Sequence, residues 1–307
     1  MLGCLLLLPM SFYAVLQHDT PVFTPPDTSS ALADLTWLNA ADMLRGFGIN
    51  RPPWLYGLAT ILARPAARRF ARQLLTFDAL VGTSGLPTAS AWICSHFAPG
   101  LEVLGPSPPT TGPLLVVANH PGLLDAAALL TALNRSDLKV IAIARPLLRA
   151  LPHTSAAIIP VGTTAQHRMN AVRHAMRHLQ QGGAILTFPA GRIEPDPAHD
   201  PTAIASVSAW SASLDLFGRI ATGLPVVTAI VSHVQALAAL HHPLTRLRRD
   251  PADRQWLAAI LQVLWPHLAT TPVQIRFSPL LHADHNLRTK VQFWAKTFIQ
   301  HAHTKRL

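Results

Sequence analysis

His120 and Asp125 are the two residues of this sequence whose types and spacing best suit proton transfer. They lie in the stretch NHPGLLD at residues 119–125, which directly follows the apolar run LLVVA at residues 114–118. Such an apolar run is typical of a buried strand. A histidine that leaves the end of a strand and an acid that begins the next helix lie close together at the edge of a sheet. This pair can take a proton from a hydroxyl group and stabilise the resulting imidazolium.

A second segment that could take part in chemistry is FPAGR at residues 188–192. It follows a predicted amphipathic helix at residues 164–181, a glycine pair that ends this helix, and the apolar run AILT at residues 184–187. A turn at a strand end exposes main-chain N–H groups, and an arginine there can hold a phosphate through paired hydrogen bonds. We therefore expect Arg192 to bind an anionic group of a substrate.

These two segments, together with LPVVTAI at residues 224–230, resemble the hallmark blocks of the glycerolipid acyltransferases. That family includes glycerol-3-phosphate and lysophosphatidate acyltransferases, and it carries Asn-His-x4-Asp, Phe-Pro-Glu-Gly-Thr-Arg and Pro-Val blocks in this order. The resemblance covers roughly residues 100–280. It implies an enzyme that moves an acyl group from a thioester to the hydroxyl group of a lipid.

The sequence departs from the family pattern at positions associated with the phosphate of the acceptor. Ala190 replaces the family glutamate, and Ile193 replaces the family arginine, so that Arg192 lies one position early. The arginine that the family carries between the first two blocks has no counterpart in register, and Arg145 and Arg168 are its nearest substitutes. The acceptor can therefore be a lipid hydroxyl other than that of a lysophosphatidate.

The resemblance implies that His120 removes the proton of the acceptor hydroxyl while Asp125 orients the imidazole, so that no protein nucleophile is needed. Main-chain amides near Gly122 or Gly191 are candidates for stabilising the oxyanion. The residues that we expect to bind substrate are Asn119, Arg145, Pro189, Gly191 and Arg192. We expect no metal and no cofactor, because acyl-CoA or acyl carrier protein acts as a co-substrate.

Glu194 and Asp196, just after the second block, are interpreted as an ordinary solvated turn, with acceptor binding as the alternative. Two other functions remain open for the whole chain. One is a non-catalytic lipid-binding protein of a membrane surface, which Ala190 and the missing middle arginine favour. The other is a hydrolase that passes the acyl group to water.

Composition indicates the partners of the chain. Half of the residues are hydrophobic, only 13% are charged, and the net charge is +10. This favours an anionic membrane surface and an acidic acyl donor as partners. We expect no nucleic acid as a partner, because no nucleic-acid-binding motif accompanies the charge. No apolar run reaches the roughly 18–20 residues that span a bilayer. We expect residues 1–16 to be buried or shallowly inserted, and the protein to be peripheral or monotopic at the cytoplasmic face of the cell membrane.

Strands and helices alternate from residue 98 onward, which predicts an α/β fold with a mostly parallel central sheet covered by helices, preceded by an N-terminal helical subdomain. We divide the chain into a helical segment that can associate with a membrane, residues 1–97, and an α/β acyltransferase domain, residues 98–307. The predicted helices of the second part include single helices at residues 145–151 and 205–221. A helix at residues 54–80 carries an apolar stripe beside Arg64, Arg68, Arg69 and Arg72, which is typical either of a membrane-surface helix or of a helix packed on its own domain.

Overall fold

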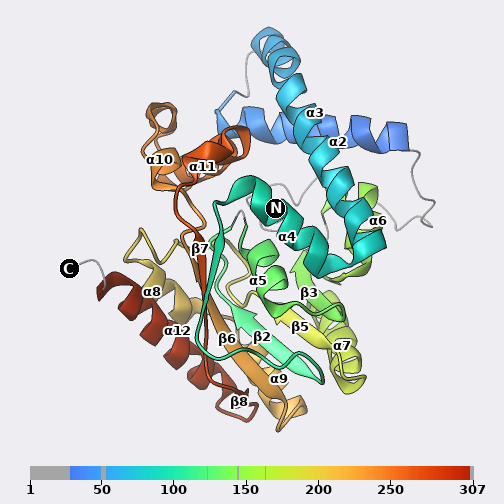
Figure 1. The fold of residues 1–307 in the computed structure, drawn as a ribbon, viewed down its shortest axis with the longest axis vertical. Coiled ribbons are helices and arrows are strands. Elements are labelled where there is room, and N and C mark those ends of the chain that lie inside the picture. Colours follow the sequence, from blue (N-terminus) through green and yellow to red (C-terminus); the bar gives the residue numbers. More distant parts are fainter. Residues whose placement is uncertain (1–27, 50–52, 123, 144, 163, 305–307) are drawn as a thin grey trace.

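The computed structural model is an α/β protein in which one sheet lies between two layers of helices, with further helices at the N-terminal side (Figure 1). It describes residues 28–49, 53–122, 124–143, 145–162 and 164–304. The prediction for residues 1–16 lies outside these ranges. The predicted fold class is confirmed.

The sheet, within the described ranges, has eight strands in the order β1-β7-β6-β2-β5-β3-β4, with β8 paired to β6. The strands are β1 (Leu101–Leu104), β2 (Leu114–Ala118), β3 (Leu138–Ile143), β4 (Ile158–Val161), β5 (Ala184–Thr187), β6 (Pro225–Ser232), β7 (Val273–Phe277) and β8 (Leu281–His282). Strands β6, β2, β5, β3 and β4 run parallel to one another, and β7 runs antiparallel to β6. The sheet is therefore mixed but mostly parallel.

Helices cover both faces of this sheet and form the N-terminal region. The longer ones are α2 (Thr28–Gly46), α3 (Pro53–Ser84), α4 (Leu86–Phe97), α5 (Asp125–Leu133), α7 (Ala165–Gln180), α9 (Ser213–Ile220), α11 (Pro251–Leu264) and α12 (Leu287–Thr304). The shorter ones are η2 (Pro146–Ala150), α6 (Pro152–Ala156), α8 (Ala203–Ser206), η3 (Val207–Ala209), α10 (Leu237–Leu240), η4 (Pro243–Leu247) and η5 (Pro266–Leu268).

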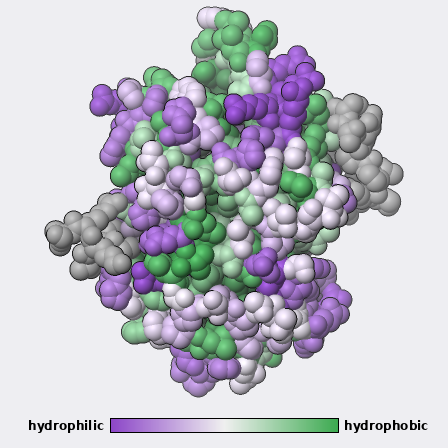
Figure 2. Space-filling model, in the orientation of Figure 1, coloured by the Kyte–Doolittle hydropathy of each residue, from purple (hydrophilic) through white to green (hydrophobic). Residues whose placement is uncertain are grey.

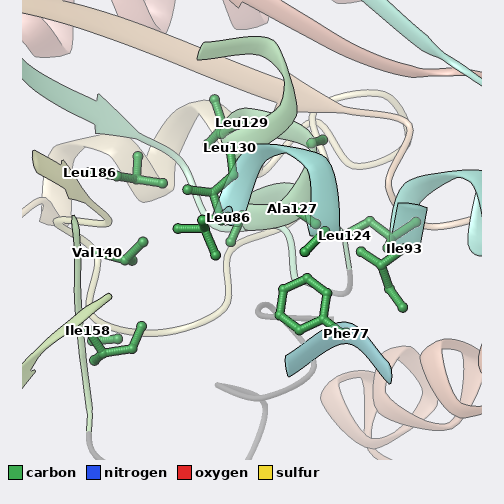
Figure 3. Packing of buried hydrophobic residues seen from close by; sticks show 14 of the residues in the cluster. Phe77, Leu86, Ile93, Leu124, Ala127, Leu129, Leu130, Val140, Ile158 and Leu186 are labelled. Carbon is green, nitrogen blue, oxygen red and sulfur yellow. The ribbon is translucent and has the colours of Figure 1, made fainter. Parts of the chain in front are cut away.

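The central strand β2 is buried on both sides, which explains its uninterrupted apolar sequence. Leu114, Val116 and Ala118 face a core shared with α3, α4 and α5, whereas Leu115 and Val117 face a second core formed with α7, α9 and α12. Figure 3 shows the first core, in which leucines of α5 lie near aromatic and aliphatic side chains of α3 and α4. This core joins the N-terminal helices to the sheet. The division of the chain into two domains at residue 97 stays a prediction.

A polar contact also ties the N-terminal helices to the α/β part. Asp78 of α3 is buried, and its Oδ1 accepts hydrogen bonds from both the main-chain N–H and the hydroxyl group of Thr154 in α6, each at 2.6 Å. Two donors on one carboxylate oxygen hold this part of α3 against α6.

Two predicted helices were wrong in their extent. The helix predicted at residues 205–221 is divided into α8, η3 and α9, because the chain turns at Trp210 to bury the indole ring. The helix predicted at residues 145–151 is the short 3₁₀ helix η2, which begins at Pro146 and leaves Arg145 in extended conformation before it.

Candidate active site

The three sequence blocks meet at one edge of the sheet. In the parallel pairing of β2 with its two neighbours, Val117 lies beside Thr187 of β5 and Ala118 lies beside Ala229 of β6. The segments that follow these three strands therefore leave the sheet at adjacent carboxyl ends. In open α/β sheets this is the edge where ligands bind, at the point where the chain changes direction across the sheet.

His120 and Asp125 meet at this edge, as the spacing predicts. Nδ1 of His120 donates to Oδ2 of Asp125 at 2.6 Å, and both side chains are buried. Asp125 is the first residue of α5, where the partial positive charge of the helix end favours a carboxylate. Its two oxygens also accept the main-chain N–H groups of Gly122, at 2.8 Å, and Ala126, at 2.6 Å. These bonds hold the carboxylate in one orientation.

The hydrogen bond with Asp125 determines which nitrogen of His120 is available. An ionised carboxylate only accepts hydrogen bonds, so Nδ1 carries the proton and Nε2 of the neutral ring is an acceptor. Among the described residues, no hydrogen bond to Nε2 occurs. Phe188 lies against the imidazole with the ring centroids 4.6 Å apart. The second block therefore contacts the catalytic candidate directly through its first residue.

Asn119 lies beside the pair, but its amide group binds the protein itself. The Nδ2 group of Asn119 donates to the carbonyl of Val231 at 2.9 Å, and its Oδ1 accepts the Val231 N–H at 2.7 Å. These bonds connect the end of β2 to β6. Substrate binding by Asn119 stays a prediction.

The second block forms a turn that places its other residues differently. Pro189 is buried, and its carbonyl accepts the main-chain N–H of Ser211 at 3.0 Å. Gly191 has a positive φ of 61° and is exposed, and Arg192 beside it is exposed as well. Substrate binding by these three residues stays a prediction.

Both amides considered for oxyanion stabilisation have acceptors within the protein. The N–H of Gly122 donates to Asp125, and the N–H of Gly191 donates to the carbonyl of Phe188 at 3.1 Å. In this structure both amides donate within the protein, and their role in oxyanion stabilisation stays a prediction.

Arg145 follows β3 at the same edge of the sheet, with β5 between its strand and β2. Its positive charge acts on Asp42 of α2. Burial raises the pKa of Asp42 from 3.8 to about 6, while the charges of Arg45 and Arg145 oppose this rise. Arg145 therefore lies near enough to α2 for its charge to act on Asp42, and its role in substrate binding stays a prediction.

Glu194 lies at this site, where acceptor binding is the alternative to its interpretation as part of a solvated turn. It is buried, so the interpretation as a solvated turn is wrong. Its carboxylate accepts the His120 N–H at 2.9 Å, the Trp210 indole N–H at 2.8 Å and the Ser206 hydroxyl at 2.8 Å. Burial raises the pKa of Glu194, and these hydrogen bonds oppose the rise. A short polar turn between prolines contains no signal for such burial.

Asp196 is buried as well and supports the end of β6. Its carboxylate accepts main-chain N–H groups of His233, Val234 and Gln235 at 2.8–3.0 Å, so the chain after β6 curves around this side chain. Gln235 in turn donates to the carbonyl of Pro121 at 3.3 Å. Glu194 and Asp196, which follow β5, therefore connect the end of β5 to the ends of β2 and β6.

Two comparisons with known proteins find a similarity. Residues 101–232 match the family model described as Acyltransferase. The chain is also similar to the crystal structure of the 1-acyl-sn-glycerophosphate (LPA) acyltransferase PlsC from Thermotoga maritima, with a TM-score of 0.42 and 15% identity, over 89% of this chain and 94% of that chain. No curated protein matches the sequence significantly. The family match extends from β1 to the end of β6 and includes His120 and Asp125, so over residues 101–232 this chain is similar to the acyltransferase family.

Proposed function

We propose that the protein transfers a fatty acyl group from acyl-CoA or acyl carrier protein to a hydroxyl group of a glycerolipid or lysophospholipid. One observation above all supports this function: the 2.6 Å hydrogen bond from His120 to Asp125, which leaves Nε2 as a base at the carboxyl edge of the sheet. The pair lies within the segment that matches the acyltransferase family model.

The reaction needs one base and no covalent intermediate on the protein. Nε2 of His120 takes the proton of the acceptor hydroxyl as its oxygen attacks the thioester carbonyl. The tetrahedral intermediate then collapses to the ester, the C–S bond breaks, and the imidazolium returns its proton to the sulfur. Asp125 stabilises the imidazolium in between. A base positioned in this way contributes roughly 10²–10⁴ in rate.

A phosphate-bearing lipid is the acceptor that we propose first, and a lipid alcohol without phosphate is the alternative. The blocks around residues 119–125 and 188–192 resemble those of glycerolipid acyltransferases, and Arg192 is an exposed cation four residues from Phe188, which touches His120. Such a guanidinium can bind phosphate oxygens in pairs. The high positive charge of the whole chain favours anionic lipids and acidic acyl donors.

The N-terminal helices supply a surface for peripheral contact with a membrane. Trp54, Leu58, Ile61 and Leu62 at the start of α3 are exposed, as is Trp37 of α2. Figure 2 shows apolar surface at the top of the molecule, where α3 begins in Figure 1, with strongly hydrophilic surface close to it. In the described part of the chain, no helix has the length and apolar character to cross a membrane.

The next turns of the same helix carry charge that suits anionic headgroups. Arg64, Arg68, Arg69 and Arg72 are all exposed. An apolar helix end that enters the interface, beside arginines that bind lipid phosphates, is the arrangement of a membrane-surface helix. This arrangement supports our proposal that the protein is peripheral at the cytoplasmic face of the cell membrane, in contact with anionic lipids.

Release of free thiol from acyl-CoA tests the enzymatic proposal. We expect purified protein to release thiol only when a lysophosphatidate or a related lipid alcohol is present, and His120→Ala to abolish the release. His285→Ala, which changes an exposed histidine before α12, is the matched control and should retain full activity. Thiol release without a lipid acceptor would identify a hydrolase, and no release from any thioester would identify a lipid-binding protein. Full activity of His120→Ala would make the mechanism wrong.

A further inference from the structure

Glu194 is a buried carboxylate of this site that takes no direct part in the proton transfer proposed above. We propose that Glu194 is a positioning residue: it holds the main chain of His120 so that the imidazole stays between Asp125 and the acceptor hydroxyl. This inference rests on the proposed function, in which His120 is the base.

Glu194 holds both main-chain polar groups of His120. The N–H of His120 donates to Oε2 of Glu194 at 2.9 Å, and the N–H of Glu194 donates to the carbonyl of His120 at 2.8 Å. A single residue thus binds the backbone from which the imidazole extends. Because the 2.6 Å bond to Asp125 tolerates little displacement, a fixed backbone at position 120 is what keeps the ring in place.

The carboxylate of Glu194 is itself fixed from the other side. Its Oε1 accepts the indole N–H of Trp210 and the hydroxyl of Ser206, both at 2.8 Å. Trp210 is almost completely buried, in the bend that separates η3 from α9. Glu194 therefore connects the backbone at the end of β2 to a rigid part of the second core, and it cannot rotate without leaving a buried donor unpaired.

The hydrogen bonds of Glu194 also act on its own carboxyl group. Burial raises the pKa of this group, and the hydrogen bonds from Trp210, Ser206 and the main chain of His120 oppose that rise.

Glu194→Gln tests the proposal because it keeps the size of the side chain but replaces one of its two acceptor oxygens with an NH2 donor. One end of the new amide must face an N–H donor, either that of His120 or that of Trp210. The hydroxyl of Ser206 can accept from the amide, because its own proton also reaches the carbonyl of Ala203 at 2.8 Å. Trp210→Phe removes the competing donor, so the double variant Glu194→Gln/Trp210→Phe can again bind the His120 N–H through the amide oxygen.

We expect kcat of Glu194→Gln to fall about 10- to 100-fold with KM for both substrates unchanged, since displacement of a reacting group by about 1 Å can cost 10²-fold. Kcat should be higher in the double variant than in Glu194→Gln. Glu102→Gln is the matched control, because Glu102 is the other glutamate of the chain and is exposed on β1, where it accepts from Gln274. Its kcat should equal that of the unaltered protein.

Proton NMR gives a readout that does not depend on turnover. The short bond between His120 and Asp125 should give a far-downfield Nδ1–H resonance, which we expect to shift or disappear in Glu194→Gln and to return in the double variant. If His120→Ala kept its activity, the proposed function would fail, yet this resonance would still show whether Glu194 positions the ring. An unaltered resonance and kcat in Glu194→Gln would overturn the inference, as would a rise in KM without a change in the resonance.

Trp210→Phe alone gives the test if Glu194→Gln does not fold. It removes one of the two side-chain donors that hold Oε1 of Glu194 and leaves the packing of a large ring in place. Positioning predicts a lower kcat and an altered resonance at unchanged KM. Wild-type values for both quantities would overturn the inference.

Discussion

The side-chain amide of Asn119 exchanges two hydrogen bonds with the main chain of Val231, as a peptide group of a neighbouring strand would. The bonds continue the contact between β2 and β6 beyond the last paired residues of the two strands. His120 is the next residue, so the hydrogen bonds between β2 and β6 extend to the residue directly before the proposed base. In this structure Asn119 is part of the support for the site.

Asn119→Ala should lower the free energy of unfolding by on the order of 3 kcal/mol, because both main-chain groups of Val231 lose their partner in a buried position and each costs about 1–3 kcal/mol. Urea unfolding measures this loss. Asn39→Ala is a suitable control, since Asn39 makes one longer bond to the carbonyl of Ala67, at 3.4 Å. A stable variant with a raised KM for the acceptor would instead support substrate binding by Asn119.

Asp125→Asn should reduce kcat by roughly 10²–10⁴ and leave the protein folded. The amide has only one acceptor oxygen, whereas the carboxylate accepts from His120, Gly122 and Ala126. The imidazole then loses the group that fixes its tautomer and stabilises its cation. Steady-state kinetics gives kcat, and circular dichroism checks the fold. Asp34→Asn, at an exposed position of α2, should be fully active, and an equally active Asp125→Asn would disprove the assigned role.

The pair of His120 and Asp125 could be predicted from sequence because both positions depend on local structure. An apolar run indicates where β2 ends, and the next helix begins a few residues later, so the strand and the turn together with the spacing bring the two side chains close. Glu194 could not be found in this way. Its burial depends on the turn of the chain at Trp210 and on the carboxyl end of β2, which are 16 and 74 residues away.

The same reasoning explains the error in the helix predicted at residues 205–221. The local pattern favours one helix, whereas the tertiary structure requires Trp210 to enter the core and reach Glu194. The N–H of Ser211 then bonds to the carbonyl of Pro189, which a continuous helix would not allow. Long-range contacts of this kind override local propensity.

Arg192→Ala should raise KM for a phosphate-bearing acceptor and change kcat little, because binding of a headgroup contributes equally before and during the reaction. An acceptor without phosphate should show a smaller difference between the two proteins. Arg219→Ala, which alters another exposed arginine on α9, serves as the control. Unchanged KM for both acceptors would show that Arg192 does not bind the headgroup.

Asp42 should make stability depend on pH. Its pKa is about 6 in the folded protein against an ordinary 3.8, so the folded state keeps the proton over a range in which the unfolded state has lost it. The free energy of unfolding should therefore fall as pH rises from about 4 to 6. Asp42→Asn should remove this part of the pH dependence, as urea unfolding across the range would show, whereas Asp34→Asn should not. Parallel curves for Asp42→Asn and the unaltered protein would contradict the shift.

Association with vesicles should depend on the first turns of α3. In Leu58→Ser/Ile61→Ser/Leu62→Ser the apolar residues that enter the interface are lost, so binding to vesicles that contain anionic lipid should decrease strongly in a sedimentation assay. Higher salt should weaken binding of the unaltered protein, because the four arginines attract headgroups through screened charges.

A matched control removes exposed apolar side chains elsewhere. Leu247→Ser/Leu280→Ser/Phe293→Ser changes three residues of similar exposure that lie outside the N-terminal helices, and it should bind vesicles like the unaltered protein. Thiol release with a short-chain, water-soluble acceptor should be the same in both triple variants, since neither alters the edge of the sheet that carries His120. If the two triple variants lost vesicle binding equally, binding would depend on surface hydrophobicity in general, and the assignment of the membrane contact to α3 would be wrong.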